Sequence, residues 1–396
     1  MAEYPVVEAD LHQKIGPPTS HFEEIDGLRE KYRYFWNNSA QGYWVLTRFA
    51  DIREAFQMPE SFGNHSIVAV DPVPKYRFLP SYSDPPIHMK YRGPMNRWFS
   101  PKAVAGFAPR MHEHAQNIIA GFVDQGSGDF LKVFGDQYPA QNFAYAMGLP
   151  SADVPFFIQC SNRISGNITH SNPDPVAAMN DIKAYFSEAL ADRRQRPRDP
   201  SVDFVTHLMG ARIDDRPLDD EEFLDICMTL TFGSLDTTKS VLGWSFWHLA
   251  THPDDREWVV RDPEIVPSAV EEFLRAYPIV SMARKLTQDI DFHGCPMKKD
   301  DMVLLAIQAA TRDPEVFPEP KEVRLDRSPN RHIAFGASEH RCLGSHLARA
   351  ELQIALTEWH RQIPDYRIPE GAEVLAHGGQ VSLNSLPLEW PIPSTH

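Results

Sequence analysis

FGASEHRCLGSHLARAEL, residues 335–352, places Cys342 between a Phe-Gly turn and the start of a strongly periodic helix. The apolar residues that follow the cysteine recur at helical spacing, which predicts that one face of this helix is buried. They are Ala348, Leu352, Ala355, Leu356, Trp359 and Ile363. Cys342 is therefore expected just before the N-terminus of a buried helix, where free backbone N–H groups and the helix dipole favour a thiolate over a thiol.

The neighbours of this cysteine favour a chemical role over the plain alternative, which is a small buried hydrophobic side chain. Gly336 and Gly344 let a flat ligand approach the backbone closely, and Phe335 can pack against such a ligand. His340 and Arg341 add polar or cationic groups beside it. The stretch therefore indicates a binding site for a flat ligand around a reactive sulfur.

A second anomaly lies in LDDEEFLDICMTLTFGSLDTTKSVLGWSFWHLATH, residues 218–252. Asp219 and Glu222 have the spacing of a capping box, and the apolar residues beyond them predict one helix of about 30 residues, roughly 45 Å long, through the centre of the body. The polar run GSLDTT, residues 233–238, interrupts its middle. Glycine and back-bonding Ser and Thr side chains weaken a regular helix, so a local distortion is expected there. The alternative, a run that faces solvent, is disfavoured by the dense apolar flanks.

Composition predicts a soluble globular protein without a membrane anchor. The chain has 396 residues, of which 42% are hydrophobic and 23% charged, and its mean hydropathy is −0.39. The N-terminus has no signal-like apolar segment and no apolar run is long enough to span a membrane, so a cytoplasmic location is expected. The net charge of −15 disfavours nucleic acid as a partner. The four cysteines form no CxxC pair, which fits a reducing compartment.

The order of the periodic segments predicts a mainly α protein that forms one domain over residues 1–396. No internal repeat or low-complexity linker divides the chain. The expected elements are a strand at 42–48, a short helix at 49–57, a long proline-rich loop at 70–86, helices over about 100–275 and a Gly-Gly hairpin within 373–390. Small amounts of sheet are therefore expected toward the two ends of the chain, with a large helical region between them.

Several of these segments together resemble the cytochrome P-450 family of heme-thiolate monooxygenases, in particular its soluble bacterial members, over essentially the whole chain. FGASEHRCLG at 335–344 is similar to the family's cysteine-ligand loop, and GSLDTT at 233–238 is similar to the oxygen-binding segment of its central helix. Glu272 and Arg275 match the family's E-x-x-R pair, with Arg327 as the expected third partner. The resemblance implies the cytochrome P-450 fold, with a long central helix and small β-sheets near the N- and C-terminal regions.

The sequence departs from the family's usual pattern at two places. Ser338 stands in the cysteine loop where glycine is common, and Ser234 stands in the central helix where a second glycine is common. Neither substitution removes a reacting group. Ser234, however, adds a hydroxyl beside the segment that the resemblance assigns to oxygen binding.

The resemblance implies heme b, iron protoporphyrin IX, as the cofactor and Cys342 as the ligand of its iron. A thiolate ligand pushes electron density toward bound oxygen and favours O–O cleavage. Thr237 would hydrogen-bond the bound dioxygen, and Asp236 would pass protons inward from solvent. The other predicted cofactor-binding residues are His88, Arg92, Arg284 and His340, which would hold the heme propionates, and Phe335 and Gly344.

These polar residues have plain alternatives. Each propionate contact is also explained by an ordinary surface side chain, and Glu272 with Arg275 by an ordinary surface i,i+3 salt bridge. His88 and Arg92 are four residues apart and would share one helix face, so together they could hold propionates by charge-assisted hydrogen bonds. Glu272, Arg275 and Arg327 are expected to form a buried structural network rather than a catalytic group.

YRFLPSYSDPP, residues 76–86, resembles the corresponding loop of the camphor-hydroxylating branch of the family. That likeness implies that the Tyr76 hydroxyl donates a hydrogen bond to a substrate carbonyl; the alternative is that Tyr76 packs in the loop with its hydroxyl in water. The implied wall around the substrate is mostly apolar and consists of Ile67, Thr229, Phe232, Ile279 and Val280. A small terpenoid or a similar alicyclic or aromatic compound is therefore the expected substrate, with large flexible fatty acids as the alternative.

Electrons for such a reaction must come from outside the chain, because the sequence contains no flavin or nicotinamide fingerprint and no four-cysteine cluster motif. The expected partner is an acidic iron–sulfur ferredoxin, reduced by a flavoprotein, that contacts Arg349 and Arg92 on the face behind Cys342. Two other function classes remain open. One is a cysteine nucleophile at Cys342 with His340 or His346 as its base, and the other is a heme-thiolate sensor without enzymatic activity.

Overall fold

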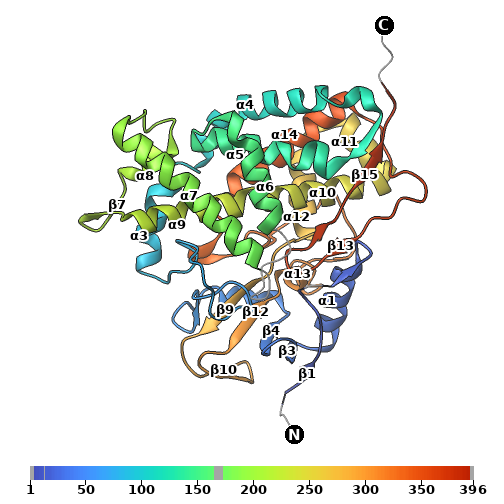
Figure 1. The fold of residues 1–396 in the computed structure, drawn as a ribbon. Coiled ribbons are helices and arrows are strands. Elements are labelled where there is room, and N and C mark those ends of the chain that lie inside the picture. The colour runs from blue at the N-terminus through green and yellow to red at the C-terminus, as the bar shows by residue number, and fades with distance from the viewer. Residues whose placement is uncertain (1–3, 13, 165–172, 393–396) are drawn as a thin grey trace.

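The computed structural model describes residues 4–12, 14–164 and 173–392. Most of its helices form one large group, and a smaller β-rich part lies beside them together with α1 (Ser20–Lys31) (Figure 1). Among the described residues, no helix is both long and apolar enough to cross a membrane. The other helices are α2 (Phe49–Ala55), α3 (Ile87–Asn96), α4 (Pro101–Ala120), α5 (Gln137–Met147), α6 (Val154–Ile164), α7 (Pro173–Gln195), α8 (Phe204–Met209), α9 (Asp220–Ser234), α10 (Asp236–Thr251), α11 (Pro253–Arg261), α12 (Val266–Ala276), α13 (Ile307–Ala310) and α14 (Ser345–Gln362).

The central helix of the prediction is present as two consecutive helices, α9 and α10, which run one after the other across the molecule (Figure 1). The capping box is formed as predicted, because the Asp219 side chain accepts from the Glu222 N–H and the Glu222 side chain accepts from the Asp219 N–H. The regular helix is interrupted at Leu235, which has φ −87° and ψ −65°. The expected distortion is therefore confirmed, and it separates two helices rather than bending one.

The β-rich part is built on a six-stranded sheet in the order β1-β3-β4-β12-β9-β5. The predicted strand at 42–48 and helix at 49–57 are present as β4 and α2. All four residues of β4 are buried, because β4 lies between β3 and β12 inside the sheet. The strands are β1 (Val6–Val7), β3 (Tyr34–Asn37), β4 (Tyr43–Leu46), β5 (Phe62–Gly63), β9 (Met282–Leu286) and β12 (Met302–Leu305).

The predicted Gly-Gly hairpin is also present. Strands β13 (Ala376–His377) and β14 (Ser382–Leu383) pair antiparallel, and β13 also pairs with β2 (Ile15–Gly16). Gly379 in the turn has φ +81°, a conformation that favours glycine, and a Cβ there would lie 3.1 Å from the His12 carbonyl oxygen. The glycines thus bring the turn close to the N-terminal segment. The remaining strand pairs are β6 (Ser127–Asp129) with β15 (Pro387–Glu389), β7 (Arg212–Ile213) with β8 (Arg216–Pro217), and β10 (Ile290–Phe292) with β11 (Cys295–Met297).

The helix after Cys342, α14, buries the predicted apolar stripe. Leu352, Leu356 and Trp359 are each at most 2% exposed, and the helix packs against α4 and α12. The proline-rich segment 70–86 forms turns between β5 and α3 without regular structure, as predicted. These elements converge on the interior between α9, α10 and the start of α14, where the candidate site lies.

Candidate active site

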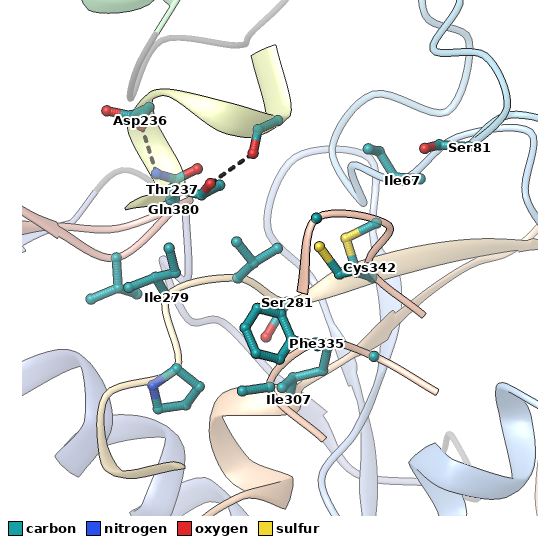
Figure 2. Close-up of a pocket in the computed structure, with 18 of the residues that line it drawn as sticks. Ile67, Ser81, Asp236, Thr237, Ile279, Ser281, Ile307, Phe335, Cys342 and Gln380 are labelled. Carbon is teal, nitrogen blue, oxygen red and sulfur yellow. Dashed lines mark hydrogen bonds between the residues drawn. The ribbon is translucent and has the colours of Figure 1, made fainter. Parts of the chain in front are cut away.

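A cavity of about 430 Å³ lies between the break in the central helix, the Cys342 loop and strand β9. Figure 2 shows Cys342 and Phe335 on one side of it and Asp236 with Thr237 on another. Most of the predicted site residues line this cavity, although they come from distant parts of the sequence. These residues are Ile67, His88, Arg92, Thr229, Phe232, Asp236, Thr237, Ile279, Val280, Arg284, Phe335, His340, Cys342 and Gly344.

The loop that carries Cys342 is a tight backbone turn. The Cys342 N–H donates to the Phe335 carbonyl at 2.8 Å, and the Gly336 N–H donates to the Ile333 carbonyl at 2.8 Å. Gly336 has φ +71° and Ser338 has φ +60°. A positive φ explains why glycine is common at the position of Ser338, since a side chain costs about 1 kcal/mol in this region. The Ser338 hydroxyl forms a local hydrogen bond to Glu339 at 2.6 Å.

Cys342 is a free cysteine whose side chain is accessible from the cavity. Burial by the surrounding protein raises the pKa of its thiol, while the Gly344 N–H and Arg92 lower it without reversing the direction. In the protein alone, burial therefore outweighs the Gly344 N–H and the nearby arginines in its effect on the pKa of the Cys342 thiol. A bound metal cation would supply the missing stabilisation of the thiolate.

Four nitrogen-bearing side chains face one another at the cavity edge. His88 and Arg284 are 1% and 2% exposed, and the His88 and His340 rings lie 4.0 Å apart, centroid to centroid. His88 Nδ1 and His340 Nε2 are buried without a hydrogen-bond partner in the described protein. Burial, followed by the charge of Arg92, lowers the pKa of His88 to about 4. Burial likewise lowers the pKa of Arg284 to about 10.

This cluster is built for an anionic ligand. Buried donors without acceptors and a buried guanidinium without a carboxylate contact are costly unless a ligand satisfies them. Within the described residues, Arg284 donates to the adjacent Ala283 carbonyl at 2.8 Å. Arg92 donates to the Arg341 carbonyl at 2.5 Å and to Asn96 Oδ1 at 3.2 Å. A carboxylate in the cavity would accept from these groups and remove the desolvation penalty.

The break between α9 and α10 supplies the opposite wall. The Thr237 hydroxyl donates to the Gly233 carbonyl at 2.7 Å, and the Ser234 hydroxyl donates to the Leu230 carbonyl at 2.7 Å. The additional hydroxyl of Ser234 therefore forms a hydrogen bond within α9. Asp236 is only 8% exposed, and its carboxylate accepts from Gln380 Nε2 at 2.6 Å (Figure 2). The polar run faces the cavity and the interior rather than solvent.

The predicted substrate anchor, Tyr76, does not line the cavity. Its hydroxyl lies 3.2 Å from Asp71 Oδ2 within the same loop, and its ring packs on Phe78 at 4.8 Å. Phe78 in turn stacks on Phe232, with 4.8 Å between the ring centroids, and Phe78 rather than Tyr76 lines the cavity. The prediction missed that Tyr76 lies one layer behind the wall, and it also missed Ser81, which lines the cavity from the same loop (Figure 2).

The network of Glu272, Arg275 and Arg327 lies outside the cavity and inside the protein. Arg275 donates to both carboxylate oxygens of Glu272 at 2.8 and 2.7 Å, and Arg327 Nε lies 3.0 Å from each of them. Glu272 and Arg275 are fully buried, which excludes the surface salt bridge. The remaining guanidinium N–H groups donate to backbone carbonyls, among them Pro320 and Pro318.

Arg349, the predicted partner contact, is tied into the protein. It forms a bidentate ion pair with Glu271, at 2.5 and 2.8 Å, and its guanidinium lies 4.6 Å from the centre of the Phe335 ring. The side chain is therefore held beside the cavity wall, which sequence spacing could not show. Arg341, next to Cys342, is exposed instead.

The fold and the site together identify the class. The family model for cytochrome P450 matches residues 157–262 and 263–359 of the chain. The chain belongs to the cytochrome P450 family and is an oxidoreductase of the monooxygenase type.

The relatives lie among bacterial P450 proteins. A probable cytochrome P450 127A1 from Sinorhizobium fredii is 34% identical and is matched over 88% of this chain and 84% of its own length. The vitamin D(3) 25-hydroxylase of Pseudonocardia autotrophica is 30% identical over 84% of each protein. The crystal structure of CYP101J2 has a TM-score of 0.88 at 29% identity, with 99% of this chain and 98% of that chain covered.

The cofactor of this family is heme b, and the residues of the cavity fit it. The sulfur of Cys342 is the only thiol that lines the described cavity, and Phe335 and Gly344 lie beside it. The two orphaned imidazole nitrogens and the two arginines at the edge have the chemistry that heme propionates need. Cys342 would hold the iron. The residues at the cavity edge that would hold the propionates are His88, Arg92, Arg284 and His340.

Proposed function

We propose that this monooxygenase hydroxylates a small hydrophobic compound, a terpenoid or a similar alicyclic or aromatic molecule with one oxygen function. The observation that carries the proposal is the lining of the cavity beside the Cys342 loop. Ile67, Ile279 and Val280 supply apolar surface there, and Ser81 supplies a hydroxyl. An apolar wall with few polar groups suits a compact hydrophobic substrate that carries one oxygen function.

When bound, heme with a thiolate ligand supplies the oxygen chemistry, in which one atom of O₂ enters the substrate and the other leaves as water, at the expense of two electrons and two protons. The chain's own residues bind and orient. Ile67, Ile279 and Val280 exclude water from the substrate side. Thr237 holds a hydroxyl at the wall, and Asp236 beside it is the group that can carry protons to that hydroxyl.

Ser81 is the polar wall group that we assign to substrate orientation in place of Tyr76. It comes from the same proline-rich loop and lines the cavity near Ile67 (Figure 2). A hydroxyl beside apolar residues such as Ile67 can orient a small ligand, because the end of the ligand that carries the oxygen function hydrogen-bonds there. Larger flexible lipids would depend less on such a single contact.

We also propose a ferredoxin, reduced by a flavoprotein, as the electron donor, and the cytoplasm as the place of action. The four cysteines are free, which fits a reducing compartment. Arg341 offers an exposed positive charge next to the Cys342 loop, and a cation at an interface steers an acidic partner. Residues 1–396 would act together as one catalytic unit.

The test is a substrate panel with a reconstituted ferredoxin, its reductase and O₂. Monoterpenoids, norisoprenoids, small aromatics and fatty acids are titrated while the heme spin-state band is followed, and products are then identified. We expect the tightest binding and one main hydroxylated product from an oxygen-bearing terpenoid. Ser81→Ala is expected to weaken binding of that compound about tenfold relative to its hydrocarbon analogue, the value of one hydrogen bond.

Tyr76→Phe is the matched control in the same loop and should leave both affinities unchanged. Preferred turnover of fatty acids would contradict the substrate class, and an effect of Tyr76→Phe alone would restore the anchor predicted from the sequence. Ligand binding without any product in the reconstituted system would favour the sensor alternative.

Replacing Thr237 by alanine is expected to uncouple the reaction. Its hydroxyl is held at the wall by the Gly233 carbonyl at 2.7 Å, where it can relay a proton from Asp236. Without it, O₂ and reducing equivalents should still be consumed, while the product formed per electron pair falls roughly tenfold and hydrogen peroxide rises. Thr229→Ala, which removes another cavity-lining hydroxyl, is the control, and equal coupling in the Thr237 variant and the wild type would refute the assignment.

A further inference from the structure

The loop at residues 70–86 contacts one face of α9 at two points. Asp225 and Phe232 are seven residues apart in α9, which is about two helical turns, so their side chains lie on the same side of the helix. Arg77 Nε donates to Asp225 Oδ2 at 2.5 Å. One residue further along the loop, Phe78 stacks on Phe232, with 4.8 Å between the ring centroids and 9° between the ring planes. The loop therefore follows this face of α9 from the ion pair to the cavity wall.

Asp225 is a buried carboxylate that two cations share. Its side chain is 3% exposed, and Lys183 Nζ of α7 lies 2.5 Å from Asp225 Oδ1, the oxygen that Arg77 does not contact. The side chains of Arg77 and Lys183 are 48% and 25% exposed. A buried charge is costly unless it is paired, whereas these two cations keep access to water. The carboxylate therefore favours the conformation in which the loop and α7 both contact α9.

The part of the loop that follows Arg77 is a compact turn. The Tyr82 N–H donates to the Phe78 carbonyl at 2.7 Å, and the two rings lie 5.4 Å apart, centroid to centroid. This turn carries three residues that line the cavity, Phe78, Pro80 and Ser81 (Figure 2 shows Ser81). Because the turn is joined to itself by these contacts, a shift at Arg77 displaces the three wall residues together.

We propose that Asp225 and Arg77 are positioning residues for substrate selection, because their ion pair holds the loop on α9 and thereby sets where Phe78 and Ser81 lie in the cavity wall. Among the described residues that line the cavity, neither Asp225 nor Arg77 is present, so both act through the turn. The inference rests on the proposed function, since it concerns the hydroxyl that we assign to substrate orientation.

The test replaces Arg77 by methionine, which keeps an apolar side chain of similar reach and removes the charge. Amide hydrogen exchange of residues 70–86 is measured by mass spectrometry in the substrate-free holoenzyme. Exchange there should become about tenfold faster, because the loop opens more often without its charged hydrogen bond. Peptides from α14 should exchange at the wild-type rate. Raising the salt concentration to about 1 M should speed exchange of the loop in the wild type and not in Arg77→Met, since salt screens the half-exposed pair.

Arg194→Met is the matched control. Arg194 pairs with Asp220, the first residue of α9, and the two side chains are 53% and 58% exposed. This change also removes an arginine that contacts α9, but it leaves the loop untouched, so exchange of residues 70–86 should not change. Arg77→Lys restores the positive charge and should recover most of the wild-type protection.

A second readout measures selectivity. A monoterpenoid ketone and its parent hydrocarbon are titrated while the heme spin-state band is followed. The wild type should prefer the ketone about tenfold, and Arg77→Met should lower this preference about fivefold, because Ser81 is no longer held in place. In a Ser81→Ala background, Arg77→Met should have no further effect on the preference, since both residues act through the same contact. A structural role unrelated to the wall would lower both affinities equally and leave the preference unchanged.

The outcomes separate this inference from the proposed function. An unchanged exchange rate of the loop in Arg77→Met would overturn the positioning role, and so would an unchanged preference for the ketone or an equal effect of Arg194→Met. A wild type that binds the ketone and the hydrocarbon equally would instead refute the proposed orientation by Ser81, and the exchange rates would still decide whether Arg77 holds the loop.

Discussion

Replacing Cys342 by serine is expected to abolish both the characteristic band of the reduced carbon monoxide complex and the monooxygenase activity. The sulfur lies at the wall of the cavity, and no other cysteine of the described chain lines that space. Serine keeps the shape but is not a soft anionic ligand, so the electron push that favours O–O cleavage is lost. The band is read from a difference spectrum, and the activity should fall to the level of free heme.

Cys160→Ser provides the control for this experiment. Cys160 is buried in α6 away from the cavity, so its replacement should lower stability slightly and leave the band in place. A Cys342→Ser protein that keeps the band would show that another residue binds the iron. A hydrolase with Cys342 as its nucleophile would give no band in either protein, which separates that alternative as well.

Glu272→Ala is expected to produce the largest loss of stability, about 3–5 kcal/mol, because it leaves buried charges without their partner. The Glu272 carboxylate accepts hydrogen bonds from Arg275 and Arg327. Glu272 has no solvent exposure. The guanidinium groups would keep their backbone acceptors but lose the only carboxylate that they contact in the described network. Chemical denaturation followed by circular dichroism measures the change, and heme loss on heating should follow the same order.

The matched control is Glu113→Ala, which breaks the exposed i,i+3 pair of Arg110 and Glu113 in α4. That change should cost less than about 1 kcal/mol, since water solvates both partners. Glu272→Gln, which preserves shape and some hydrogen bonds, should lie between the two. If Glu272→Ala unfolds at the same denaturant concentration as Glu113→Ala, the network does not stabilise the fold.

The parts of the structure that depend on local chemistry could be predicted from the sequence. The capping box at Asp219 and the hairpin at Gly379 depend on residues close together in the chain, and both form as expected. The cysteine loop is likewise a short-range feature. Its position against α14 follows from the apolar stripe of that helix, which has to be buried against neighbouring helices.

The parts that depend on distant segments could not be predicted in the same way. Tyr76 was predicted to line the cavity, but Phe78, which stacks on Phe232, lines it instead. No local sequence pattern predicts this contact, because the two phenylalanines are far apart in the chain. Gln380 shows no signal in its own surroundings, since its partner Asp236 comes from another element. Predicting Gln380 as the donor to Asp236 requires knowing how the C-terminal hairpin packs against the central helix, and only the three-dimensional structure shows this packing.

The pairing of β4 with β12 also has a consequence for how the protein is made. β4 lies near the start of the chain, whereas its parallel neighbour, which pairs Val303 with Trp44, follows most of the helical region. A growing chain therefore exposes one edge of β4 until β12 has left the ribosome, and pairings of such long sequence separation form slowly. Until β12 has been synthesised, this edge of β4 and its apolar residues are open to pairing with another chain, which favours aggregation.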